Sequence, residues 1–310
     1  MRFGIMAMQL GALIPPSQGG SGAGEASSLL AHVANFSHAA LVRSLHGHGF
    51  NPIELGGDLV LFMPHVFAPQ AIEELAGLKA ETGVTYTVHL PLWSVETSTP
   101  LAPVRRGSVQ AVMEIIRAVK PLEPEVYVLH ATGALAAEFY RMRLPAHGKA
   151  LILRQFQAGA RESLRTILGE TGLPPRRLAI ETVEFPFDLT LELAEEFDLS
   201  LCLDTGHVLV GFSGPVDLFS ALERCFPRLA EIHLHDAPCL TTPALWRGPE
   251  EQSGYGKDHA PLGTGDLDLA RLLDRLVEAH FMGPVILELK VHEALASLEV
   301  IRRVRPQVLL

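Results

Sequence analysis

Cysteine is scarce in this sequence, and its pattern excludes two kinds of fold. Cys202, Cys225 and Cys239 are an odd number and form no CxxC pair, so we expect neither a disulfide framework nor a thiolate zinc cluster. Apolar runs of about 18 residues, the length that crosses a bilayer, are lacking as well. The first residues also lack the pattern of a signal peptide. We therefore expect a protein of the reducing cytoplasm, without a membrane partner.

Positive charge is also in short supply. The 310 residues include 25 Lys and Arg against 35 Asp and Glu, which gives a formal net charge of −10. Such a charge repels a phosphate backbone unless a local basic patch or a bound metal reverses the field. We therefore expect a small-molecule substrate rather than a nucleic acid. Apolar residues make up 48% of the chain and charged residues 19%, which is typical of a globular protein and not of a disordered one.

Short apolar runs alternate with stretches of helical spacing along the chain. We count eight runs, at residues 2–8, 51–55, 85–90, 125–130, 177–181, 200–204, 231–235 and 284–289. The clearest helix candidates between them are residues 104–120 and 266–279, each with one apolar stripe. Strands that are separated by helices run parallel and are buried on both faces. The pattern predicts an α/β fold, a (β/α)8 TIM barrel, as a single domain over residues 1–310.

An open, doubly wound sheet is the alternative fold. It requires a G-x-G-x-x-G turn directly after the first strand, but the glycines of residues 19–24 do not have this spacing and follow two prolines instead of a strand end. A barrel of about 250 residues leaves roughly 60 residues to spare. We place them in insertions near residues 15–25, 131–157 and 237–261. Each insertion follows a strand, so we expect it on the carboxyl-terminal rim, where long loops serve as lids or as surface decoration.

Residues that can bind a metal or transfer a proton stand at the end of almost every run. They are Glu54, His89, His130, Glu181, Asp204, His233 with His235, and Glu288. The carboxyl ends of barrel strands share one rim, so we expect these side chains to converge there. Each residue alone has an ordinary explanation, such as a satisfied rim histidine or a salt bridge. Several buried carboxylates together are costly unless a cation compensates them, so the whole set predicts a divalent metal site.

Two local patterns extend this set. In the segment CLDTGHVLVG, Gly206 turns the chain so that Asp204 and His207 can face one cavity. In HLHDA, Asp236 follows His233 by three residues and is suited to orient an imidazole or a loop.

Taken together, the motifs resemble those of the xylose isomerase-like barrel superfamily, which also contains endonuclease IV and the sugar-phosphate isomerases and epimerases. The resemblance covers almost the whole chain in order, through NPIEL, VHLP, VLHATG, AIETVE, LDTGH, HLHD, HAPLGTGDLD and ILELK. Each motif is weak by itself. As a set they are specific for the superfamily and do not name a member.

The resemblance implies a metal-dependent isomerase or epimerase of a sugar or sugar phosphate. Glu181, Asp204, His233 and Glu288 match the metal ligands of the epimerase-type site, and this mixed donor set suits a divalent Mn, Mg, Co or Zn ion. Glu181 and Glu288 also match the two carboxylates that exchange a proton on opposite faces of the sugar carbon. His207 matches a residue that holds substrate or a second metal. The catalytic residues of this interpretation are therefore Glu181, Glu288 and His207.

A polymetal phosphodiester hydrolase of the endonuclease IV type is the second interpretation. Its ligand positions are matched by His89, His130, Glu181, Asp204, His207, His233, His259 and Glu288. One position departs: the family has an Asp two residues before the histidine matched by His259, whereas this chain has Lys257 there and Asp258 displaced by one. Because of the net charge, we expect such a hydrolase to act on a small phosphodiester. The segments PLEPEVYVLH and VHLPL are similar to cobamide-remodelling phosphodiesterases of the superfamily.

A third interpretation is a barrel that binds a metal or a sugar without catalysis. The weaker candidates for substrate contacts are Glu54, Trp93, His235, Asp236, Trp246 and Arg247. Trp93 and Trp246 are expected to form an apolar wall for a sugar ring, and Arg247 is the cation that follows the strand-seven motif, where epimerases hold a distal oxygen or phosphate. We expect Asp266 to cap the next helix. Oligomeric state stays open, with a homo-oligomer as one alternative.

Overall fold

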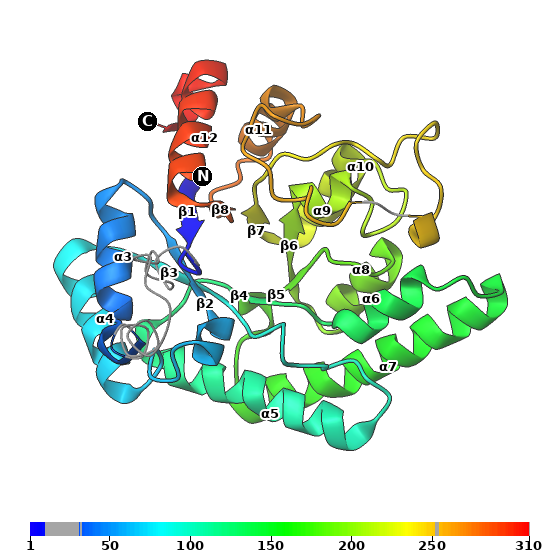
Figure 1. Ribbon diagram of the computed structural model, residues 1–310, viewed down its shortest axis with the longest axis horizontal. Helices are drawn as coiled ribbons and strands as arrows, with labels where there is room; N and C mark the ends of the chain where they lie inside the picture. The colour runs from blue at the N-terminus through cyan, green and yellow to red at the C-terminus, as the bar shows by residue number, and fades with distance from the viewer. Residues whose placement is uncertain (10–30, 32, 252–253, 310) are drawn as a thin grey trace, which may run out of the picture.

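The computed structural model describes residues 1–9, 31, 33–251 and 254–309, and its strands form one closed parallel barrel (Figure 1). The strands are β1 Arg2–Met6, β2 Ile53–Gly56, β3 Tyr86–His89, β4 Tyr127–Leu129, β5 Leu178–Glu181, β6 Ser200–Asp204, β7 Leu229–His233 and β8 Pro284–Leu287. Each strand pairs in parallel with the next one along the chain, and β8 pairs with β1. The predicted (β/α)8 TIM barrel is confirmed.

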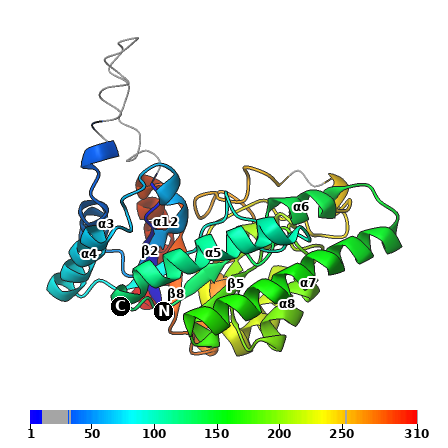
Figure 2. The same cartoon turned by 90° about the horizontal axis from the view of Figure 1, so that it is seen from below.

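Helices surround the barrel and bury its outer face. They are α3 His38–Gly47, α4 Pro69–Thr82, α5 Ala102–Val119, α6 Ala134–Arg141, α7 Ala146–Thr171, α8 Phe187–Glu196, α9 Thr205–Leu209, α10 Leu218–Cys225, α11 Leu269–Glu278 and α12 Val291–Val304. Helix α5 begins with Pro103 in its first turn, as helices often do, and buries the predicted stripe through Val112 and Ile116. Figure 2 shows α5, α7 and α8 side by side along one flank. None of the described helices is long and apolar enough to cross a membrane.

The interior of the barrel is narrow and partly polar. Val128, Ala179 and Cys202 form a small apolar cluster that is separate from the main core under the helices. Glu54 and Glu231 are also fully buried. Barrel interiors are usually filled by branched apolar side chains, so two carboxylates in this position are exceptional.

The three expected insertions have different outcomes. Residues 15–25 lie outside the described part of the chain. Residues 131–157 are mostly helical, because they contain α6 and the beginning of α7. Residues 237–261 have little regular structure apart from a short 3-10 turn, Pro249–Glu251, and residues 252–253 of this loop are not described.

Two local predictions need correction. Strand β7 was expected at residues 231–235, but it ends at His233, because the N–H of His235 donates to the hydroxyl of Thr205 and not to a strand. The helix cap expected at Asp266 is wrong. Asp268 caps α11, its side chain accepting from the N–H of Arg271, whereas Asp266 accepts from the N–H of Cys239 and so ties down the loop after β7.

Candidate metal centre

A cavity of about 610 Å³ opens at the carboxyl-terminal ends of the strands. Its polar wall comes from segments far apart in the sequence: His89, His130, Glu181, His207, Asp258, His259 and Glu288. Much of the remaining wall is apolar and includes Met8, Leu92 and Phe212. The strand-end side chains therefore converge at one mouth, as the parallel order of the strands requires.

Glu181 ends β5 and turns its two carboxylate oxygens toward different imidazoles. Oε2 lies 3.1 Å from Nε2 of His89 and 3.0 Å from Nε2 of His130. Oε1 lies 3.3 Å from Nδ1 of His207 and 3.5 Å from Nδ1 of His233. The side chain is 1% exposed. Glu181 thus belongs to two groups of potential ligands at once.

His233, the last residue of β7, is fully buried, and the Nδ1 side of its ring faces three carboxylates. Its Nδ1 lies 3.5 Å from Oε1 of Glu181, 3.9 Å from Oδ2 of Asp204 and 3.5 Å from Oε1 of Glu288. Among the described residues, Nδ1 has no hydrogen-bond partner. Two ligands of a tetrahedral ion bound at about 2.1 Å lie about 3.4 Å apart. The spacing around this nitrogen is therefore that of a cation site.

His207, Asp258 and His259 form another group of potential ligands. Oδ2 of Asp258 lies 3.6 Å from Nε2 of His207 and 2.8 Å from Nδ1 of His259. Asp258 was missed as a candidate because it is displaced by one residue from the family pattern. Its position next to His259 was the available signal. The loop that carries Asp258 packs tightly on Gly206, where a Cβ would lie 1.8 Å from the Asp258 carbonyl oxygen.

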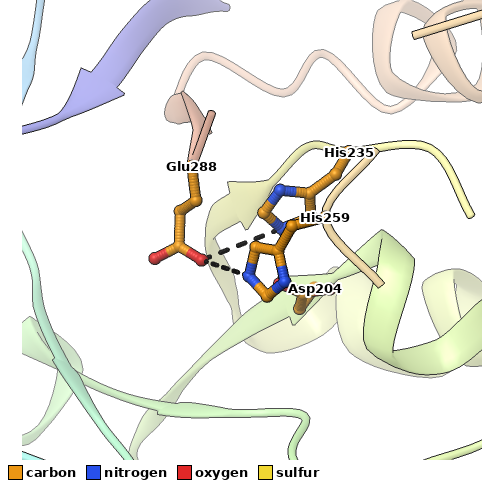
Figure 3. A group of neighbouring side chains, drawn as sticks. All are labelled: Asp204, His235, His259 and Glu288. Carbon is orange, nitrogen blue, oxygen red and sulfur yellow. Dashed lines mark hydrogen bonds and ion pairs between the residues drawn. The ribbon is translucent and has the colours of Figure 1, made fainter. Parts of the chain in front are cut away.

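Asp204, His235, His259 and Glu288 form a further group, shown in Figure 3. Nε2 of His235 lies 2.7 Å from Oδ2 of Asp204, and Nε2 of His259 lies 3.1 Å from Oε2 of Glu288. Oδ1 of Asp204 accepts the N–H of His207 at the start of α9, so Oδ2 is the oxygen turned to the imidazoles. The N-cap thus orients a ligand-type carboxylate.

The carboxylates of the site raise the pKa of some of the imidazoles around them, whereas burial lowers the pKa of His235. Burial opposes protonation of His89, but the adjacent Glu181 outweighs it and raises the pKa of His89 to about 9. For His259, burial is again outweighed by its carboxylate partners, which raise the pKa to about 10. Conversely, burial opposes ionisation of Glu181, yet the positive charges of His130 and His233 hold the pKa of Glu181 well below its usual range. The site therefore requires nearby positive charge.

Divalent cations fit the residues present. Within the described part of the chain, no Lys or Arg lies within ion-pair distance of Glu181, Asp204 or Glu288. Imidazole nitrogens and carboxylate oxygens form a donor set that suits Zn, Mn or Co. Nδ1 of His233 is buried and, in the part of the chain that the structure describes, accepts or donates no hydrogen bond, so it is available as a ligand atom. These observations identify acidic and imidazole clusters that could hold more than one ion.

The weaker candidates occupy different places. Trp93 lines the cavity and is half exposed. Trp246 and Arg247 are not among the residues that line it, and Nη1 of Arg247 donates to the carbonyl of Trp246. His235 and Glu54 are fully buried; His235 belongs to the group in Figure 3, whereas Glu54 lies deeper in the barrel.

Asp236 holds a turn. It is 1% exposed, and its two carboxylate oxygens accept the backbone N–H groups of Ala237, Gly263, Thr264 and Leu267. This is the loop-orienting alternative expected for Asp236, and these bonds engage both of its carboxylate oxygens.

A cluster at the cavity lip had no signal in the sequence. Nη1 of Arg141 lies 3.2 Å from Oε1 of Glu184, and the guanidinium carbon lies 4.6 Å from the ring centre of Tyr255. The hydroxyl of Tyr255 donates to Glu184. The three residues belong to no common motif and meet only through the fold. They link the 237–261 loop to the barrel.

Solved structures of similar shape cover nearly the full chain. A D-tagatose 3-epimerase-like protein has a TM-score of 0.69 at 19% identity, with 99% of this chain and 98% of that chain covered. A 3-keto-D-glucoside 4-epimerase from E. coli has a TM-score of 0.65 at 16% identity, covering 98% and 99%. Endonuclease IV from Thermus thermophilus has a TM-score of 0.63 at 18% identity, covering 99% and 100%. At these identities the likeness shows the fold.

Sequence comparison agrees with the fold. An uncharacterised protein of Methanocaldococcus jannaschii is 20% identical over 258 residues, which cover 79% of this chain and 78% of that protein. The family model of the xylose isomerase-like TIM barrel matches residues 42–305. The chain therefore belongs to the xylose isomerase-like TIM barrel family.

Proposed function

We propose that this protein is a phosphodiester hydrolase that uses at least two divalent cations and acts on a small molecule. The observation that carries this proposal is the position of Glu181, whose two oxygens face separate sets of imidazoles. A carboxylate in this position serves two cations. In the isomerase the same carboxylate would have to bind one ion and also take a proton from a substrate carbon.

Glu288 supports the same interpretation. Its Oε1 lies 3.5 Å from Nδ1 of His233, and its Oε2 lies 3.1 Å from Nε2 of His259. The isomerase mechanism needs Glu181 and Glu288 as exchanging bases on opposite faces of one carbon. Here both carboxylates face ligand-type imidazoles instead, so the roles of ligand and bridge fit them better than the role of base.

Asp258 supports the hydrolase as well. In the sequence, the Asp of the third ligand group is displaced by one residue from its family position. In the structure, the Asp258 carboxylate nevertheless lies between His207 and His259. A mononuclear isomerase does not need this group, or His89 and His130, as metal ligands, although isomerase-like members of the superfamily can keep the two histidines in a supporting position. Bound divalent cations would polarise the phosphoryl group and supply hydroxide at neutral pH. The chain's own residues would fix the ion positions and shape the cavity for the substrate.

A small substrate fits the cavity better than DNA does. Its volume of about 610 Å³ lies in the usual range for small-molecule sites. The net charge of −10 opposes a nucleic acid. Among the residues that line the cavity, Arg141 and Lys290 are the arginine and lysine side chains, and Arg141 is already paired with Glu184.

A mononuclear sugar isomerase or epimerase is the second candidate. It is favoured by the side chains of Glu181, Asp204, His233 and Glu288. Their carboxylate oxygens lie near Nδ1 of His233, so that the four side chains can bind one ion together. Several of the solved structures with this fold are sugar epimerases. The two candidates differ in the number of ions that they need.

Metal content and two reactions separate the candidates. Protein prepared without chelator is analysed for bound metal, then assayed for hydrolysis of bis(p-nitrophenyl) phosphate and for exchange of ketose protons with deuterated solvent. The hydrolase predicts two or three ions per chain, hydrolysis, and no exchange. One ion with proton exchange would reverse the assignment.

A variant pair sharpens this test. His89→Ala removes a ligand that only the polymetal site uses, so we expect hydrolysis to fall at least a hundredfold, roughly the loss typical of a missing catalytic group. His292→Ala changes the same residue type at an exposed position of α12 and is the matched control. Equal activities of these two variants would contradict the polymetal hydrolase.

A further inference from the structure

We infer that Glu54 is a positioning residue, which orients the ring of His233 for metal binding from the layer beneath the ion. The inference rests on the proposed metal site and not on the reaction carried out there. It assigns a role to a buried carboxylate that lies too deep to touch substrate.

The geometry pairs a buried donor with a buried acceptor. Nε2 of His233 lies 3.4 Å from Oε2 of Glu54, and both side chains have no exposed surface. Among the described residues, neither this nitrogen nor either oxygen of Glu54 has a hydrogen-bond partner. Leaving both groups unpaired away from water is costly. A small rotation that forms the Nε2–H···Oε2 bond satisfies both groups at once.

Strand register explains why Glu54 lies below His233 and not beside it. Glu54 pairs with Thr87 across β2 and β3, and His89, two residues further along β3, pairs with Gly56. Glu54 is therefore one layer deeper in the barrel than the ligand-type residues at the strand ends. Side chains two residues apart on a strand point to the same side, so Glu54 faces the same interior into which the site opens.

The other buried carboxylate is less free to take this role. Oε1 of Glu231 accepts the hydroxyl of Thr87 at 3.1 Å and lies 3.8 Å from Nε2 of His233. Glu54 lies closer to the ring than Glu231 does, at 3.4 Å against 3.8 Å, and the two carboxyl groups contact each other. The structure therefore assigns the orienting role to Glu54.

The consequence for the metal site follows from the two nitrogens of the imidazole. A hydrogen bond from Nε2–H to a carboxylate fixes the tautomer that leaves the lone pair on Nδ1. Nδ1 is the atom that faces Glu181, Asp204 and Glu288. The same bond makes Nδ1 more basic and holds the ring in place, and loss of such a partner typically weakens metal affinity about 10–100-fold.

The test uses Glu54→Gln in the full chain, with zinc affinity measured by competition with a chromophoric chelator. Glutamine keeps the shape of glutamate and removes the charge. We expect about 10–100-fold weaker binding of the ion at His233. The matched control is Glu96→Gln, in which a half-buried carboxylate that caps the start of α6 is changed in the same way. Equal zinc affinity of Glu54→Gln and the wild type would overturn the inference.

A second measurement does not depend on the variant folding. In the zinc-loaded wild-type protein, ¹⁵N-histidine NMR should show His233 protonated on Nε2, with slow exchange of this proton. Protonation on Nδ1 would also overturn the inference. Neither experiment measures turnover, so failure of the hydrolase proposal, seen as a missing reaction, is distinguishable from failure of the Glu54 assignment.

Discussion

Replacing Glu181 by glutamine tests the bridging geometry directly. Its oxygens face His89 and His130 on one side and His207 and His233 on the other. We therefore expect Glu181→Gln to lose two ions per chain, whereas His130→Ala should lose one. The assay is elemental analysis of protein dialysed against a fixed concentration of free zinc.

The expected effect on stability can be estimated for each ion. A site with free metal at 100 times its dissociation constant stabilises the folded state by about 2.7 kcal/mol. For 310 residues the unfolding entropy is about 0.65 kcal/mol/K, at about 2.1 cal/mol/K per residue. Each bound ion should thus raise Tm by about 4 °C.

Comparing metal-loaded and chelated samples of the same variant removes the effect of the substitution on the metal-free fold. The gain in Tm on adding zinc should be smaller by about 8 °C in Glu181→Gln and by about 4 °C in His130→Ala, by the same arithmetic. If Glu181→Gln loses one ion or none, the bridging role of Glu181 and the main argument for the hydrolase are refuted.

Three further predictions concern His259, the protonation of the ligand set and the loop that carries Asp258. The pKa of His259 is raised to about 10, above the ordinary 6.5. Protonated His259 therefore stabilises the folded, metal-free protein fully below pH 6.5, and this stabilisation is lost as pH rises toward 10. Thermal unfolding of the metal-free protein across this pH range should show a falling Tm. Zinc binding at pH 7.5 should release protons from the imidazoles. Titration calorimetry in two buffers of different ionisation enthalpy measures this release, and its absence would contradict a protonated ligand set. Gly206→Ala should destabilise the protein by about 1–3 kcal/mol and reduce bound metal, because its Cβ would meet the Asp258 carbonyl at 1.8 Å. Gly107→Ala, in open space on α5, is the matched control, and equal metal content in the two variants would contradict the role of the close approach.

The strand pattern was predictable because parallel barrel strands are buried on both faces and therefore are almost continuously apolar. The same pattern located His89, Glu181 and Asp204, since each ends a run and the fold brings run ends to one rim. The end of β7 was less predictable. The alternation of polar and apolar residues continues up to His235. The N–H of His235, however, donates to the hydroxyl of Thr205, which is distant in sequence, and not to a neighbouring strand.

Contacts between loops were the hardest part to foresee. Asp258 departs from the family spacing, and only the packing of its loop on Gly206 brings the carboxylate to His207. Arg141 and Tyr255 meet at the cavity lip from separate segments. No periodicity or motif in the sequence indicates either contact, because each depends on where a long connecting segment is positioned in the folded protein.

The sequence by itself determined the barrel, the rim that carries the proposed metal site and most of the residues that gather there, because strand burial and chain direction are local properties that repeat along the polypeptide. Only the tertiary structure decided how these residues divide into groups of potential ligands. Glu54 and His233 both belong to strands, yet register places one a layer beneath the other. Whether a carboxylate bridges, binds or orients depends on angstrom distances between elements, and the order of residues does not encode them locally.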